Sequence, residues 1–331
     1  MYRIKMYHGG KMRKNKNIFS SKKNIYSGRS KDKGSKALVL LLIIILGSLF
    51  GFAIFKLIGE DYFTSKTPIL ATETQVESAV EIAVNPEDLV ENSNHIHAAD
   101  PMAYSTLDVR NYITSAQPYT GEKIAFLTFD DGPNPGNTDK ILDILKEKGA
   151  RATFFIIGSR IETTSTAGAT MNRILSEGSS IGIHSYSHVY TTLYPGNTGD
   201  KDIIKAEIDK TQELIRTATG KTTFKSNVFR YPGGHMSWKE LESVVDPYLA
   251  EDGIEFIDWN AMNGDGEPTS RRPKEAEAMA NFVMESLQLS KVKNVMVVLM
   301  HDATNKTLTV EALPKIIDIL VSEGYTFGIL K

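Results

Sequence analysis

Two adjacent carboxylates, Asp130 and Asp131, end an apolar run in the stretch TFDDGP and are followed by a Gly-Pro pair. Taken alone, this stretch is typical of a solvated surface turn, because Asp, Gly and Pro are the residues that tight turns use. Successive residues of a strand point to opposite faces, so both carboxylates can serve one site only if the strand ends there. We expect Gly132 and Pro133 to end it.

Two histidines four residues apart, His184 and His188 in HSYSH, could bring two imidazoles to one metal ion on a helix or a tight loop. The zinc-protease motif HExxH is excluded, because Ser185 stands where the general-base Glu would be. A third ligand must come from elsewhere. Asp130 or Asp131 would complete a set of two histidines and one carboxylate, and the other Asp would be free as a base for metal-assisted hydrolysis.

Hydrolysis also needs a proton donor, and the base needs a partner for its charge. His301 is the natural general acid, since His titrates nearest neutrality, and we expect Asp258 or Asp302 to hold it protonated. Arg230 can pair with the free base carboxylate and orient it. Of the four histidines after residue 118, His235 alone has no predicted role.

These residues lie at the ends of apolar, β-branched runs that alternate with amphipathic stretches. The alternation predicts β/α units on a mostly parallel sheet, in which active sites gather at the carboxyl ends of the strands. The expected strands are 123–129, 152–158, 180–185, 226–231, 254–259, 294–300 and 325–330. The expected helices lie near 138–148, 167–177, 201–218, 237–248, 273–290 and 309–322. We therefore predict an α/β fold, a distorted (β/α) barrel of about seven strands, over residues 118–331.

The chain before this domain has a different composition. Residues 1–36 carry a dozen Lys and Arg against one acid, and residues 37–55 form an uncharged apolar run long enough to cross a bilayer. We expect a basic cytoplasmic tail over 1–36, a transmembrane helix over 37–56 and an extracellular, partly disordered stalk over 57–117. A cleaved signal peptide is the alternative to the transmembrane helix.

The predicted topology places the catalytic domain outside the cell membrane. The basic tail directly precedes the apolar run, which favours a topological role over nucleic-acid binding, and we expect no nucleic-acid partner. The chain has no Cys, so the exported domain must be stable by core burial without disulfides. The end of the stalk, around 104–113, is expected to pack on the domain.

In order along the chain, TFDDG, HSYSH, RYPGG, DWN and LMHD resemble the five motifs of the polysaccharide deacetylases, carbohydrate esterase family four. The resemblance covers about residues 120–331. It implies a distorted (β/α) barrel and the metal-dependent removal of acetyl groups from N-acetylated, or less often O-acetylated, sugars.

The resemblance implies a role for each residue at a motif position. Asp130 would be the general base, and Asp131, His184 and His188 would be the metal ligands, an order of the two Asp that the residues alone leave open. Arg230 would tune the base. The ligand types suit Zn, with Co or Ni as alternatives.

The later motifs supply the acid and the substrate contacts. The resemblance implies that His301 is the general acid with Asp258 as its partner, and that Trp259 and Leu299 line a pocket for the acetyl methyl group. The backbone N–H at Gly233 would bind the acetyl oxygen. Family members often carry Tyr at this position, so any sugar contact of that ring must be absent or replaced here.

An exported, membrane-anchored domain suggests a substrate in the cell envelope, and the resemblance makes N-acetylglucosamine of peptidoglycan the leading candidate. An exopolysaccharide, a chitin oligomer, N-acetylmuramic acid or acetylated xylan would use the same core. Selectivity among these glycans would lie in loops such as 263–272, NGDGEPTSRR, whose sequence does not indicate which glycan is bound. The alternative from another functional class is a glycan-binding module without catalytic activity.

Overall fold

The computed structural model describes residues 84–331. The predicted basic tail, the predicted transmembrane helix at 37–56 and the first part of the predicted stalk lie outside the described residues. Within residues 84–331, no helix has both the length and the apolar character needed to cross a membrane.

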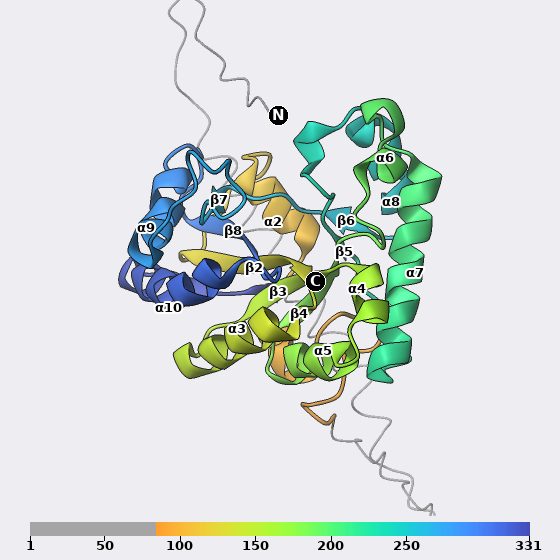
Figure 1. The fold of residues 1–331 in the computed structure, drawn as a ribbon, viewed down its shortest axis with the longest axis horizontal. Helices are drawn as coiled ribbons and strands as arrows, with labels where there is room; N and C mark the ends of the chain where they lie inside the picture. Colours follow the sequence, from red (N-terminus) through yellow and green to blue (C-terminus); the bar gives the residue numbers. More distant parts are fainter. Residues whose placement is uncertain (1–83) are drawn as a thin grey trace, which may run out of the picture. The chain divides into compact units, whose positions relative to one another are not determined.

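A curled, fully parallel β-sheet forms the centre of the domain (Figure 1). Its strand order is β6-β5-β4-β3-β2-β8-β7, and β9 pairs with β2 off this path. The bounds are β2 (Ile124–Gly132), β3 (Ala152–Ile156), β4 (Ser180–Ile183), β5 (Val228–Phe229), β6 (Glu255–Phe256), β7 (Ala261–Met262), β8 (Val295–His301) and β9 (Thr326–Phe327). The predicted α/β class and parallel sheet are confirmed.

The sheet is an open half-barrel, which corrects the predicted barrel. Among the described strands, β6 and β7 form the two edges and do not pair with each other. The short link 257–260 runs between these edges without a helix, and the Arg230 side chain donates to two of its carbonyl oxygens, those of Ile257 and Asp258. This link therefore bridges the opening that a closed barrel would fill with further strands.

Helices cover the outer face of the sheet (Figure 1). They are α3 (Pro135–Lys148), α4 (Gly158–Thr163), α5 (Ala167–Ser176), α7 (Lys201–Thr219), α9 (Ala276–Leu287) and α10 (Thr307–Ser322). Short elements connect them: α6 (Tyr190–Leu193), η2 (Pro195–Asn197), η3 (His235–Ser237), η4 (Leu241–Val245) and α8 (Asp246–Ala250). The last three replace the helix predicted over 237–248. Glu240 has φ +60° and Pro247 lacks a backbone N–H, so one continuous helix cannot form there.

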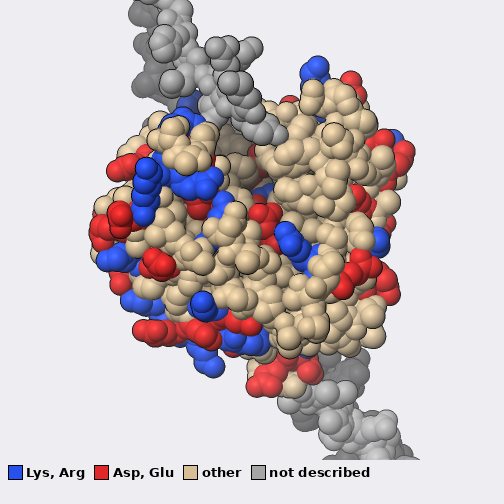
Figure 2. All heavy atoms as spheres, viewed as in Figure 1, with Lys and Arg blue, Asp and Glu red and all other residues tan. Residues whose placement is uncertain are grey.

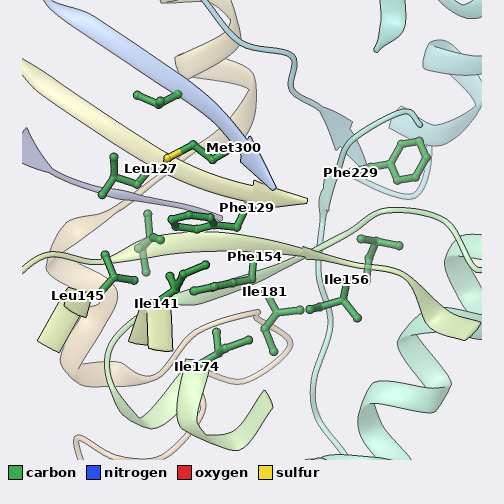
Figure 3. Close-up of a cluster of buried hydrophobic side chains, with 14 of the residues drawn as sticks. Leu127, Phe129, Ile141, Leu145, Phe154, Ile156, Ile174, Ile181, Phe229 and Met300 are labelled. Carbon is green, nitrogen blue, oxygen red and sulfur yellow. The ribbon is translucent and has the colours of Figure 1, made fainter. Parts of the chain in front are cut away.

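The main core lies between the sheet and these helices. Leu127 and Phe129 of β2 and Phe154 of β3 meet Ile141 and Leu145 of α3 in the close-up of Figure 3. The Phe129 and Phe154 rings stack with centroids 5.3 Å apart. Full burial of each such side chain contributes about 1.5–3 kcal/mol, so this layer fixes the strand ends that carry the polar motifs.

The inner face of the half-barrel has its own apolar cluster, which contains Phe126 of β2 and Val109 of α2 (Thr106–Ile113). Side chains alternate along a strand. Thr128 and Asp130, two and four residues after Phe126, therefore emerge on this inner face, beyond the apolar cluster.

The described residues from Asn94 to Ile113, which we assigned to the stalk, pack on this domain. The Asn94 side chain donates to the carbonyl oxygens of Ile181 and Leu330 at 3.1 and 3.0 Å. After η1 (His97–Met102), β1 (Ala103–Tyr104) pairs in parallel with β10 (Ile329–Leu330). Arg110 of α2 forms an ion pair with Glu255 at 2.7 Å. The expected packing of 104–113 is confirmed, and the folded unit begins before residue 118.

Candidate active site

The two adjacent carboxylates lie at the carboxyl end of β2, which ends directly after them. β2 runs to Gly132, but its pairing with β3 shifts register between Asp130 and Gly132, and Asp131 has φ +81°. His184 Nε2 lies 3.7 Å from Asp130 Oδ2 and 3.9 Å from Asp131 Oδ1, so both carboxylates reach one site. The expected strand end at Gly132 is present, and a bulge with a left-handed residue just before it brings both carboxylates to the site.

Asp131, His184 and His188 form a group that could hold a metal ion. One possible ligand atom from each lies within 4.8 Å of the others, and His188 Nε2 is 3.5 Å from Asp131 Oδ1. His184 Nδ1 donates to the Arg230 carbonyl at 2.9 Å, which leaves the lone pair on Nε2, facing the carboxylates. The donor set therefore fits a divalent transition metal.

The buried His184 imidazole is in the protonation state that ligation requires. Burial, followed by the proximity of His188, lowers the pKa of His184 to about 3. The ring is therefore neutral at any pH near 7, and a neutral imidazole is the form that binds a metal ion.

Arg230 and Asp130 form a buried ion pair at the centre of the site. Arg230 Nη1 donates to Asp130 Oδ1 at 2.9 Å and to Thr128 Oγ1 at 2.7 Å, and neither side chain is exposed by more than 4%. The guanidinium lies 4.1 Å over the Phe155 ring. The predicted pairing of Arg230 with Asp130 is therefore present, and it fixes the orientation of the carboxylate that points into the site.

His301 stands opposite Asp130, because the two residues are register partners on β8 and β2. Its carboxylate partner is Asp265, which corrects the prediction of Asp258 or Asp302. His301 Nδ1 and Asp265 Oδ1 are 2.7 Å apart. Burial opposes the imidazolium, but the attraction of Asp265, together with that of Asp130 and Asp131, outweighs burial and the pKa of His301 rises to about 9. His301 therefore holds a proton at neutral pH.

The two carboxylates predicted for that role lie elsewhere. Asp258 Oδ1 accepts the backbone N–H of His235 at 3.1 Å. Asp302 is fully buried and accepts a hydrogen bond from the Thr138 hydroxyl. Burial raises the pKa of Asp302 to about 7.

The predicted substrate contacts flank this centre. Leu299 is buried two residues before His301 on β8 and so shares its side of the strand. The Trp259 ring lies 5.8 Å from the Arg230 guanidinium. Gly233 is exposed with φ +82°, and within the described part of the chain its N–H has no hydrogen-bond acceptor. This N–H is available to a substrate oxygen.

Comparisons with known proteins give the family. The polysaccharide deacetylase model matches residues 117–246. A peptidoglycan-N-acetylglucosamine deacetylase of Bacillus cereus is 31% identical over 227 residues, which make up 67% of this chain and 92% of the relative. The chain belongs to the polysaccharide deacetylase family.

Solved structures agree with this membership. A carbohydrate esterase family four enzyme of Streptococcus mutans is 43% identical and covers 75% of this chain and 100% of its own, with a TM-score of 0.70. The catalytic domain of a peptidoglycan N-acetylglucosamine deacetylase from Eubacterium rectale is 27% identical, with a TM-score of 0.53. This match covers 66% of the present chain and 94% of the Eubacterium rectale chain. The half-barrel is thus the fold of a polysaccharide deacetylase.

Asp265 is the residue of this deacetylase that sequence reasoning missed. It lies in NGDG, within the loop 263–272 that could not be interpreted, directly after the two-residue strand β7. Its Oδ2 accepts the His301 backbone N–H at 2.9 Å and the Thr309 hydroxyl at 2.7 Å. A polar residue after a strand was the available signal, but a strand of two residues has no detectable periodicity.

Aromatic rings occupy the space beside Gly233, the position at which the resemblance implies a Tyr. A Cβ at Gly233 would lie 3.1 Å from the Trp238 ring and 3.4 Å from the Tyr190 hydroxyl. The Tyr190 ring lies 5.4 Å from His188 and 5.1 Å from Trp238, and Trp238 stacks on Tyr194 at 4.0 Å. The rings of Tyr190 and Trp238 thus lie next to His188 of the candidate metal-binding group.

Proposed function

We propose that this protein is a metal-dependent N-deacetylase of a cell-envelope glycan, with N-acetylglucosamine of peptidoglycan as its substrate. The observation that carries the proposal is one arrangement of charges. An arginine-paired carboxylate, Asp130, lies between a metal-binding group and His301, which is protonated at neutral pH. This is the set of a base, an electrophile site and an acid that amide hydrolysis requires.

Asp131, His184 and His188 would hold the ion, and Zn²⁺ suits these ligands, with Co²⁺ or Ni²⁺ as alternatives. When bound, the ion would lower the pKa of a water molecule and polarise the acetyl carbonyl. The oxygen and nitrogen donors of these three residues, and the neutral state of His184, support this assignment.

The residues around the ion would move the protons. Asp130, oriented by Arg230, takes a proton from the attacking water, and the new C–O bond shifts charge onto the acetyl oxygen, to which the Gly233 N–H donates. His301 then gives a proton to the sugar nitrogen as the C–N bond breaks. The products are acetate and an amino sugar on the polymer.

The surface beside the metal-binding group suits a sugar chain. Trp259 and Leu299 would line the pocket for the acetyl methyl group. Tyr190 and Trp238 present rings that can pack against pyranose faces, and Met236, two residues before Trp238 in the chain, is 89% exposed. Figure 2 shows a largely uncharged surface over the part of the molecule that carries α6 and α8. A neutral polymer fits this face better than a polyanion.

The location of the substrate rests on the predicted anchor. A transmembrane helix over 37–56 with a basic flank would place the deacetylase at the outer side of the cell membrane, next to peptidoglycan. The relative from Bacillus cereus acts, by its name, on peptidoglycan N-acetylglucosamine. A Bacillus subtilis relative, 36% identical over 142 residues and matched over 28% of its length, is named for N-acetylmuramic acid. That sugar is the second candidate.

Mass spectrometry of muropeptides tests the proposal. Purified cell wall is treated with the full chain and digested, and the fragments are searched for loss of one acetyl group. The full chain is needed, because a fragment that begins at residue 118 lacks β1 and α2. We expect glucosamine, with its free amine, in place of N-acetylglucosamine. Deacetylated N-acetylmuramic acid would favour the second candidate, and intact sugars throughout, with binding retained, would favour a silent glycan-binding module.

A further inference from the structure

Glu207 of α7 lies outside the five motifs, yet its carboxylate binds the loop that carries both candidate metal-binding histidines. Its Oε2 accepts the backbone N–H groups of Tyr186 and Ser187, each at 3.0 Å, and its Oε1 accepts the Ser187 hydroxyl at 2.7 Å. Glu207 is only 9% exposed. Among residues 84–331, every hydrogen bond of this carboxylate goes to the HSYSH loop.

The HSYSH loop has a backbone that needs outside support. Ser185 has φ +62° and His188 has φ +56°, the left-handed region that residues other than Gly rarely adopt. Such residues cost about 1–3 kcal/mol each and persist where their surroundings hold them. Within the loop itself, the Ser185 hydroxyl accepts the His188 N–H at 3.0 Å.

The carbonyl oxygens of Ser185 and Tyr186 are held by α4 and by a second residue of α7. Gly158 and Ser159, at the start of α4, donate their N–H groups to the carbonyl oxygens of Ser185 and Tyr186 at 3.0 and 2.9 Å. Thr211, one turn after Glu207 on α7, donates its hydroxyl to the Ser185 carbonyl at 3.1 Å. Glu207 is thus the acceptor for two N–H groups of the loop, while α4 and Thr211 bind the carbonyl oxygens of Ser185 and Tyr186.

This placement matters for the geometry of the two imidazoles. His184 is fixed separately, since its backbone N–H donates to Ile156 and its Nδ1 to the Arg230 carbonyl. The position of His188 instead depends on the path of Tyr186 and Ser187, the residues that Glu207 binds. Loss of the carboxylate would therefore move His188 relative to His184 and Asp131.

We infer that Glu207 is a positioning residue that sets the affinity of the Asp131, His184 and His188 group for a divalent cation. The inference rests on the proposed function, because it assumes that these three residues bind a metal ion. Outer residues that orient metal ligands typically change metal affinity about 10–100-fold when they are replaced.

The test measures Zn²⁺ affinity by competition with a chromogenic chelator, in the full chain and in Glu207→Gln and Glu207→Ala variants. Gln retains one acceptor oxygen and Ala retains none. We expect the Zn²⁺ dissociation constant to rise about 10–100-fold in the Ala variant and less in the Gln variant. At saturating Zn²⁺, kcat should return to within a few-fold of the unmodified protein, because Glu207 does not touch the reacting atoms.

Glu213→Gln is the matched control. Glu213 lies on the same helix, with its side chain 67% exposed and paired to Arg216. This variant should bind Zn²⁺ like the unmodified protein. Ser187→Ala removes one of the three hydrogen bonds to Glu207, and the bond that the Val189 N–H donates to the Ser187 hydroxyl, without removing the Glu207 charge. It therefore gives a reading if Glu207→Ala does not fold.

The outcomes separate the inference from the proposed function. Affinities within two-fold of the unmodified protein in folded Glu207→Gln and Ser187→Ala variants would overturn the inference and leave the deacetylase assignment intact. An unmodified protein that releases acetate but binds no divalent cation would overturn both the inference and the metal-dependent part of the proposed function.

Discussion

His301 and Asp265 form a pair in which the imidazole Nδ1 lies 2.7 Å from the carboxylate Oδ1. The backbone N–H of His301 and the Thr309 hydroxyl bind the other carboxylate oxygen. The carboxylate is therefore fixed before any substrate arrives. Because Nδ1 is occupied by this bond, Nε2 is the atom that can give a proton to a leaving amine.

This pair predicts the alkaline limb of the pH profile. The pKa of His301 is raised to about 9, so the imidazolium is kept up to that pH and activity falls above it. Asp265→Asn removes the attraction that raises the pKa and should move the alkaline limb of kcat/KM down by about one pH unit or more. Asp318→Asn is the control, since Asp318 is an exposed partner of Lys148. An alkaline limb that stays in place in Asp265→Asn would contradict this role.

The proposed base and acid predict large losses of turnover. Asp130→Asn removes the proton acceptor and His301→Ala removes the donor, and each should lower kcat by about two orders of magnitude or more. The measurement is initial-rate acetate release at saturating substrate and Zn²⁺, with circular dichroism to show that each variant is folded. Turnover within a few-fold of the unmodified protein in either variant would refute the assignment.

The buried ion pair of Arg230 and Asp130 predicts a non-additive effect on stability. Arg230→Met leaves the Asp130 charge buried without its partner and should lower the free energy of unfolding by about 3–5 kcal/mol. Adding Asp130→Asn removes that charge, so the double variant should be more stable than Arg230→Met alone. Urea denaturation of the metal-free proteins measures the cycle, and additive losses would argue against coupling.

The bulge in β2 predicts that Gly132 tolerates no side chain. A Cβ at Gly132 would lie 2.5 Å from Asp302 Oδ2, and Asp302 is fully buried and bound by Thr138. Gly132→Ala should therefore lower the free energy of unfolding by about 1–3 kcal/mol. Gly136→Ala is the control, because a Cβ there meets nothing within 4 Å and lies in α3. Equal stability of both variants would contradict the close contact.

The sequence was sufficient for the residues whose placement depends on strand ends. Asp130, His184, Arg230 and His301 follow apolar runs that the alternation of hydrophobic residues identifies as parallel strands, and parallel strands bring their carboxyl ends together. The structure places these four side chains around one centre.

The sequence was not sufficient where the placement of a residue depends on backbone conformation or on a very short strand. The left-handed Asp131 and the register shift beside it leave no trace in hydrophobic periodicity. β7 has two residues, so Asp265 after it was not recognised as a strand-end group. The packing of Asn94 on two carbonyl oxygens is a long-range contact that a polar stretch does not reveal.

Acetate release as a function of bound Zn²⁺ tests the central claim most directly. Metal-free full chain is titrated with Zn²⁺ while peptidoglycan deacetylation is followed, with a His188→Ala variant alongside. We predict that activity rises in proportion to bound metal and saturates at one equivalent per chain, and that His188→Ala binds Zn²⁺ weakly and stays inactive at that equivalent. Undiminished acetate release by the metal-free protein would contradict the account.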